Sequence, residues 1–177
     1  MAYPQAYIDY LVHFHATRDY FECHEQLEDY WKTLPKDDPA GVLWVGLIQL
    51  AVAQYHYRRC NFAGARKMLA AAASRLKPER LGELGLNGSA LAALVEEQRA
   101  ALHAEPAPRP FADLALPIVD SSLLGTCLAR SAQLGAKWGS ASRLEDEALV
   151  HRHSRRDRSE VVQARIRSLA AKKRTTS

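Results

Sequence analysis

The hydrophobic pattern of the chain centres on residues 39–57, a stretch that contains no Asp, Glu, Lys or Arg. The spacing predicts a helix that is apolar on every side, including one seam with members at steps of three and four: Val42, Val45, Gln49, Val52 and His56. Such a helix belongs inside a protein or in a membrane. A membrane would leave the polar members unpaired, and the stretch barely reaches the ~20 residues of a span. The pattern therefore predicts the buried central helix of a soluble bundle.

The neighbouring segments predict further helices on both sides of this one. Residues 4–16 carry a first apolar periodicity, and Asp19 followed by Glu22 predicts a capping box that opens a second helix, ending near residue 33. A short break with prolines at both ends follows, so helices two and three should be antiparallel neighbours. Asn61 is expected to cap a fourth helix, and the apolar spacing over residues 91–102 predicts a fifth.

The last part of the chain has a different composition. Four of the eight prolines fall within residues 105–117, which predicts an extended strap laid over the bundle. After residue 119 the periodicity weakens, and we expect a basic, partly disordered tail with a short helix at 159–173 that carries Val162, Ile166 and Leu169 on one side. The sequence thus predicts an all-α fold, with a compact bundle of about five helices in residues 1–119 and the tail in residues 120–177.

The distribution of charge and the cysteines indicate a candidate partner and the cellular compartment. The net charge of +4 divides into −2 over residues 1–119 and +6 over residues 120–177. Clustered basic residues can hold phosphate backbones, so nucleic acid is a candidate partner for residues 151–174. The N-terminus lacks the basic region of a signal peptide, and three widely spaced cysteines, Cys23, Cys60 and Cys127, favour reduced thiols. We therefore expect a cytoplasmic protein without a membrane association.

Two motifs carry a resemblance to a known family. Residues 20–28 read YFECHEQLE and are followed by Trp31; residues 46–51 read GLIQLA and are followed by His56, Arg59 and Asn61. Over roughly residues 10–77, the chain resembles the bacterial and archaeal family called domain of unknown function 309. The resemblance implies a compact all-helical bundle and no particular activity. One departure is Cys60, where the family usually has glycine; either Cys60 or Asn61 must then take the left-handed conformation of the turn.

Polar residues on two otherwise apolar seams are the candidate site. His24 and Glu28 share a seam of the second helix with Trp31, while Gln49 and His56 lie on the seam of the central helix. An unpaired buried hydrogen-bonding group costs about 1–3 kcal/mol, so these groups need partners. One interpretation is a structural network, in which His24 is hydrogen-bonded to Gln49 and Glu28 is paired with a lysine or an imidazole. A second is a divalent-metal site formed by His24, Glu28 and His56. A third is a small-ligand pocket lined by all five residues.

Antiparallel packing about a turn near residue 37 estimates which residues meet. The estimate places His24 beside Gln49 and Glu28 beside Gly46. His56 lies about 10 Å further along the helix and should meet the start of the second helix or His15. The polar groups are therefore expected to form two clusters.

Three functions follow from these features. The first is a cytosolic binding or scaffold module that engages a protein partner and contains a buried His/Glu/Gln network. The second is a metal-dependent, hydrolase-like enzyme in which His24, Glu28 and His56 hold a divalent metal and Glu25 is the acid or base, so that Glu25, Glu28 and His24 are the catalytic candidates. The third is a nucleic-acid-associated protein that acts through its basic tail. The chain has no phosphate loop, dinucleotide turn, zinc-ribbon spacing or serine nucleophile elbow.

Overall fold

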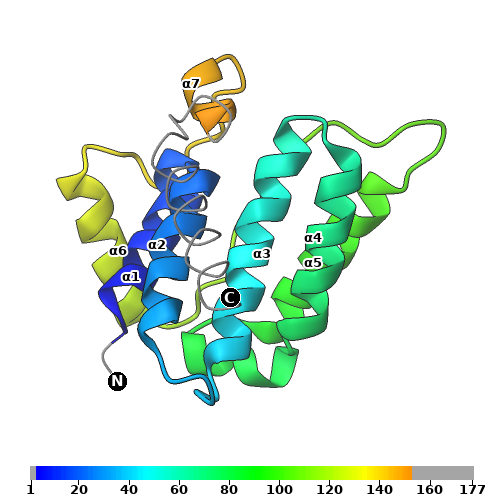
Figure 1. Ribbon diagram of the computed structural model, residues 1–177. Helices are drawn as coiled ribbons and strands as arrows, with labels where there is room; N and C mark the ends of the chain where they lie inside the picture. Colours follow the sequence, from blue (N-terminus) through cyan, green and yellow to red (C-terminus); the bar gives the residue numbers. More distant parts are fainter. Residues whose placement is uncertain (1–2, 153–177) are drawn as a thin grey trace, which may run out of the picture.

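Helix α3 (Gly41–Arg58) runs through the middle of the fold, with α2 (Tyr20–Thr33) on one side and α4 (Phe62–Arg75) on the other (Figure 1). The computed structural model describes residues 3–152. Its other helical elements are α1 (Gln5–Val12), the π-helix η1 (His13–Thr17), the 3-10 helix η2 (Pro78–Leu84), α5 (Gly88–Leu102), α6 (Ser121–Gln133) and α7 (Glu147–Val150). Residues 3–152 contain no strand beyond one isolated bridge. The predicted all-α fold is confirmed.

The π-helix η1 and one residue in the left-handed conformation, Arg18, join α1 to α2. α1 continues directly into η1, and Arg18 then reverses the chain with a φ of 55°. The Asp19 carboxylate accepts a hydrogen bond from the backbone N–H of Glu22 at 3.0 Å, which is the cap predicted for the second helix. The reciprocal half of the capping box is absent, because the Asp19 N–H donates to the Thr17 hydroxyl and the Glu22 carboxylate accepts a hydrogen bond from the Gln26 side chain at 2.9 Å. The start of α2 is therefore fixed by Asp19.

Short turns connect α3 to both of its neighbours, so α2 and α4 each run antiparallel to it. At the second turn, Cys60 adopts the left-handed conformation with a φ of 57°, and the N–H of Asn61 bonds back to the His56 carbonyl at 3.0 Å. Asn61 then caps α4 by accepting the Gly64 N–H at 3.1 Å. Of the two residues that could take the left-handed position, Cys60 does so.

The core lies where α1, α2, α3 and α4 meet. Leu43, Leu47 and Leu50 of α3 are fully buried, and the hydroxyl of Tyr10 donates to the Leu47 carbonyl at 2.9 Å. Gly46 faces α4, because a Cβ atom there would lie 2.7 Å from Leu76. The register estimate placed Gly46 beside Glu28, whereas the side of α3 on which Gly46 lies is occupied by the end of α4. The register estimate fixes height along the helix axis but not direction around it.

The prediction that α3 is buried on every side is wrong for one seam. Val42 is 43% exposed, and Val45, Gln49, Val52 and His56 are only partly buried. Among residues 3–152, α2 and α4 pack on either side of α3 and do not fully cover this seam. Periodicity shows which residues share a face, but it does not show which face a neighbouring helix will cover.

The proline-rich strap follows the prediction. Residues 105–117 contain no helix, and Leu114 and Leu116 are buried against the bundle. The hydroxyl of Tyr57 at the end of α3 donates to the Arg109 carbonyl at 2.9 Å. The strap therefore closes the side of the bundle formed by α3 and α5.

Residues 120–152 are more ordered than the sequence predicts. Asp120 caps α6, whose Leu123 and Cys127 are buried, and Arg130 forms an ion pair with Asp9 of α1 at 2.8 Å. The expectation of a low-order tail is thus wrong for α6 and α7, while the division of the chain at residue 120 stays a prediction. The helix predicted at 159–173 lies outside the described residues. No helix within residues 3–152 has the length and apolar character needed to cross a membrane.

Candidate binding groove between α2 and α3

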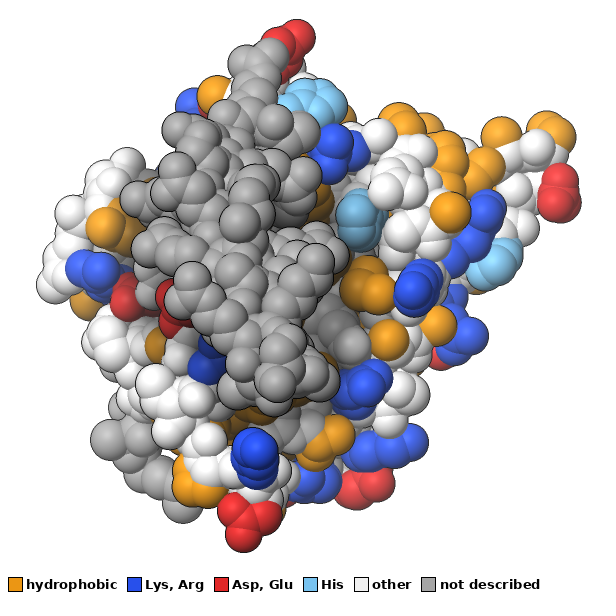
Figure 2. Space-filling model, viewed as in Figure 1, with side chains coloured by type: hydrophobic (Ala, Val, Ile, Leu, Met, Phe, Trp, Pro, Cys, Tyr) orange, Lys and Arg blue, Asp and Glu red, His pale blue; other side chains and the backbone are white. Residues whose placement is uncertain are grey.

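Within the described residues, the partly exposed seam of α3 and the neighbouring face of α2 form a groove, here called the α2–α3 groove. One end is a cavity of about 300 Å³, the aromatic cavity, lined by Tyr20, Phe21, His24, Val52, Tyr55, His56 and Arg59. The other end is a more open hollow beside the α2–α3 turn, lined by Trp31, Pro35, Lys36, Asp37, Asp38, Gly41, Val42, Val45 and Arg75. In Figure 2, hydrophobic side chains lie among basic ones and histidines on the α3–α4 side of this face.

Aromatic rings build the walls of the aromatic cavity. The rings of Phe21 and Tyr55 are 6.3 Å apart between centroids, so they face each other across α2 and α3. The Arg59 guanidinium lies 4.9 Å from the centre of the Tyr55 ring, within cation–π distance. The cavity therefore combines an apolar floor with a cationic rim at its α3 end.

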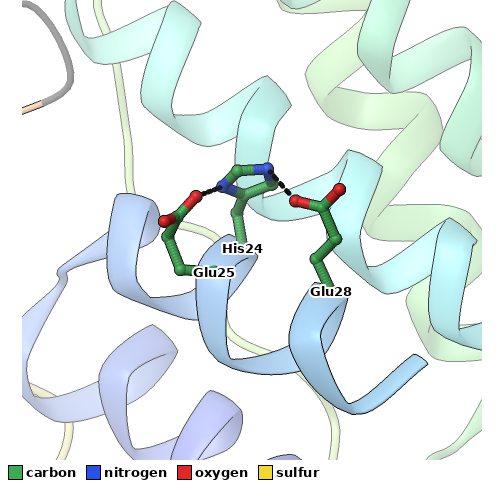
Figure 3. A group of neighbouring side chains, drawn as sticks. All are labelled: His24, Glu25 and Glu28. Carbon is green, nitrogen blue, oxygen red and sulfur yellow. Dashed lines mark ion pairs between the residues drawn. The ribbon is translucent and has the colours of Figure 1, made fainter. Parts of the chain in front are cut away.

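His24 lies between two carboxylates of its own helix (Figure 3). Its Nδ1 is 3.2 Å from Glu25 Oε1, and its Nε2 is 3.1 Å from Glu28 Oε2. Lys32 holds the other oxygen of Glu28 at 3.0 Å. Glu28 lies one helical turn after His24, and Lys32 lies one turn after Glu28. This is the spacing at which side chains of one helix meet. Glu28 was expected to pair with a lysine or an imidazole, and it pairs with both.

The same three residues are the candidate metal ligands among the described residues. Ligand atoms of His24, Glu25 and Glu28 lie within 4.8 Å of one another, and His56 is not a member of this group. The two imidazole nitrogens point in different directions, so one ion can coordinate only one of them. An ion at Nε2 with Glu28 would leave Glu25 to hold the Nδ1 proton, a usual arrangement for a metal-bound histidine. Two protein ligands are fewer than the three of most catalytic zinc sites.

The polar residues of α3 have separate surroundings. Gln49 Oε1 is buried and accepts no hydrogen bond from the described residues, so the expected bond from His24 is absent at this atom. His56 lines the aromatic cavity beside Tyr20 at the start of α2, as the register estimate predicts, and its Nδ1 is 3.0 Å from the Asn61 amide nitrogen. His15, the other expected neighbour of His56, stacks instead on Trp138 with 4.5 Å between ring centres.

Two buried arginines form a polar network that the sequence did not reveal. Arg18 donates to the carbonyls of Phe14, Leu114 and Ser140 at 2.7–3.1 Å. Arg58 donates to the Arg18 carbonyl at 2.6 Å, and burial lowers the pKa of its guanidinium. Because each arginine bonds to carbonyls far away in the sequence, no local pattern distinguishes it from an ordinary residue at a helix end.

This network brings the end of the described chain to the groove. Arg58 donates to the Leu149 carbonyl at 2.9 Å, and Arg59 donates to His151 at 3.3 Å. Arg152 then pairs with Asp19 and lies 3.4 Å from the Glu22 carboxylate. The chain therefore reaches residue 152 beside the N-terminus of α2, at the end of the groove where the aromatic cavity lies.

The sequence identified part of this groove and missed the rest. His24 and His56 line the aromatic cavity, whereas Trp31 lines the hollow at the other end. Tyr55 was not among the candidates, and Arg59 entered only through the motifs that carry the family resemblance and not as part of this cavity. Their position beside the seam at Val52 and His56 was the available signal.

Comparisons with known proteins agree with the resemblance. A sequence model of the family described as domain of unknown function (DUF309) matches residues 7–68. The chain is 41% identical over 175 residues to "Uncharacterized protein YpuF" of Bacillus subtilis (strain 168), covering 98% of both chains. No solved structure matches the chain. The chain belongs to the DUF309 family.

Proposed function

We propose that this protein is a binding module that holds a basic amphipathic helix in the α2–α3 groove. The observation that carries the proposal is the seam of α3, which has no charged residue and is only partly buried, in a chain where 25% of residues are charged. Solvated helix faces normally carry charged side chains. An uncharged face next to an aromatic cavity is typical of a surface that a partner covers.

The shape of the groove suits a helix. Helices that bind in grooves use apolar anchors at steps of three, four and seven residues. The aromatic cavity can receive one anchor, and Val42 with Trp31, which are 43% and 37% exposed, offers a second contact at the other end. Val42 and Val52 are about 15 Å apart along α3 at 1.5 Å per residue, so a partner helix of about three turns would reach both ends.

The charges beside the groove favour one kind of partner helix. On the α2 side of the groove, Glu25 and Glu28 flank His24. Lys32 is the one basic residue of that helix. Opposite charge on a partner speeds its encounter and fixes its orientation, while like charge is repelled. A helix with basic residues beside its apolar seam therefore fits this groove better than an acidic one.

The test uses a probe peptide of about 18 residues, five turns of helix, with leucine on one face and arginine on the other. Fluorescence anisotropy of the labelled peptide is measured against the full chain. Val52→Asp places a charge in the groove and should weaken binding about tenfold or more, which is 1.4 kcal/mol or more. Val119→Asp makes the same change at a valine that is 64% exposed and outside the groove, and should leave binding unchanged. Equal affinities for the two variants, or no binding by any form, would refute the proposal.

A divalent metal at His24 and Glu28 is a second candidate, favoured by the carboxylate that holds each nitrogen of His24. Metal analysis of protein purified without an affinity tag tests it. Stoichiometric metal that is lost in His24→Ala would support this candidate, and its absence from the unaltered protein would remove it. The hydrolase-like enzyme depends on the same result and additionally requires His56 to join the site.

Two expectations stay predictions. Nucleic-acid binding through residues 151–174 concerns a segment that lies almost wholly outside the described residues. The cytoplasmic setting rests on the cysteines, all three of which are free thiols, with Cys23 and Cys127 buried and Cys60 exposed.

A further inference from the structure

We infer that residues 159–173 of the same chain are the resident occupant of the α2–α3 groove. The inference rests on the helix-binding function proposed above and names the helix. A partner helix would then compete with this segment for the groove.

The path of the described chain leads to the groove. Arg18 holds the Ser140 carbonyl at 2.7 Å, Arg58 holds the Leu149 carbonyl at 2.9 Å, and Arg152 pairs with Asp19. These contacts fix the last described residues at the N-terminus of α2, beside Tyr20 of the aromatic cavity. The following residues therefore start from one end of the groove rather than from a distant face.

The length of the remaining chain fits the groove. Twenty-five residues, 153–177, follow residue 152. The fifteen residues 159–173 would span about 22 Å as a helix, and the fourteen residues of α2 span about 21 Å. Residues 153–158 are available as the connection between the fixed chain end and this segment.

The pattern of the segment complements the groove. Val162, Ile166 and Leu169 recur at steps of four and three and would form one apolar seam to meet the uncharged seam of α3. Arg165 and Lys172 are seven residues apart, so both would lie on one flank of that seam, where they suit the acidic α2 side. Residues 153–177 carry eight basic and two acidic side chains, the charge that the groove selects.

Cys60 provides a probe of this placement in the natural chain. It is exposed and follows Arg59 of the aromatic cavity, whereas Cys23 and Cys127 are buried, and burial raises the pKa of both buried thiols. A nitroxide spin label should therefore attach at Cys60 alone. Paramagnetic broadening of amide signals is then measured across residues 153–177 of the full-length, isotope-labelled protein.

The expected result is strong broadening within residues 159–173 that does not change on dilution. Ile166→Asp combined with Leu169→Asp removes the apolar seam without altering any described residue, and should abolish the broadening. The same double variant should bind the probe peptide at least several-fold more tightly than the unaltered chain, because the groove is then vacant.

The outcomes separate this inference from the proposed function. Probe binding that is sensitive to Val52→Asp but equal in the unaltered chain and the double variant, without broadening, overturns the inference and leaves the function standing. Broadening that also appears when spin-labelled chains are mixed with separate isotope-labelled chains, and that fades on dilution, places the segment of a second copy in the groove and overturns the intramolecular placement. Loss of the broadening on adding RNA, with the probe affinity of the double variant unchanged from that of the unaltered chain, assigns the segment to nucleic acid and also overturns the inference.

Discussion

The buried stack of His15 on Trp138 makes stability depend on pH in a way that can be worked out. His15 is 4% exposed and lies in the middle of the π-helix η1, and its Nε2 has no hydrogen-bond partner among the described residues. Burial, with a smaller contribution from the nearby Arg18 charge, lowers the pKa of His15 from 6.5 to about 4. The folded protein therefore keeps this imidazole neutral at a pH where the unfolded chain protonates it.

The direction of this pH dependence follows from the number of protons that the folded and unfolded states bind. Between pH 6.5 and pH 4 the unfolded state binds more protons than the folded state, so the free energy of unfolding falls as the pH falls. The contribution of His15 is complete above its unfolded pKa and is lost on the way down to pH 4. A shift of about 2.5 pH units corresponds to about 3 kcal/mol at 1.36 kcal/mol per unit.

His15→Phe keeps an aromatic ring against Trp138 and removes the titration. Urea denaturation of both proteins at pH 7, 5.5 and 4 should show the unaltered chain losing about 3 kcal/mol more than the variant over this range. His103→Gln changes an exposed histidine and should follow the unaltered chain. Parallel pH profiles for the unaltered chain and His15→Phe would refute the burial of a neutral His15 against Trp138.

Three further substitutions test how the groove is held, each by urea denaturation. Arg58→Met leaves the carbonyls of Arg18 and Leu149 without their donor and should cost about 2–4 kcal/mol, and a cost below ~1 kcal/mol would contradict the network. Asp19→Ala removes the cap of α2 and should cost about 1 kcal/mol, whereas no change would mean that the cap is dispensable. Gly46→Ala should cost about 1–3 kcal/mol because its Cβ would meet Leu76 at 2.7 Å. Gly41→Ala, whose nearest contact would be 3.6 Å, is the matched control, and equal effects at the two glycines would argue against the close approach of α3 and α4.

Local rules predicted the parts of the fold that local chemistry decides. The cap at Asp19, the cap at Asn61 and the extended strap each depend on a few neighbouring residues, and each is present. The register estimate also placed His56 beside the start of α2, because a short antiparallel turn fixes which residues lie at the same height.

The missed features depend on contacts far apart in the sequence. Nothing near Arg58 shows that its guanidinium will be buried on a carbonyl ninety-one residues away. α6 presents only Leu123, Cys127 and Ser131 as buried residues, too short a seam to recognise. Whether Val45 and Gln49 face the core or a groove is decided by where α2 and α4 pack, and the sequence of α3 alone cannot show it.

The most direct test of the helix-binding groove is amide chemical-shift mapping. The isotope-labelled chain with Ile166→Asp and Leu169→Asp is titrated with the probe peptide, so that the chain's own segment does not compete. Shift changes are expected to concentrate at Phe21 and His24 of α2 and at Gln49 and Val52 of α3. Changes confined to α5 or α6, or no change at saturating peptide, would contradict it.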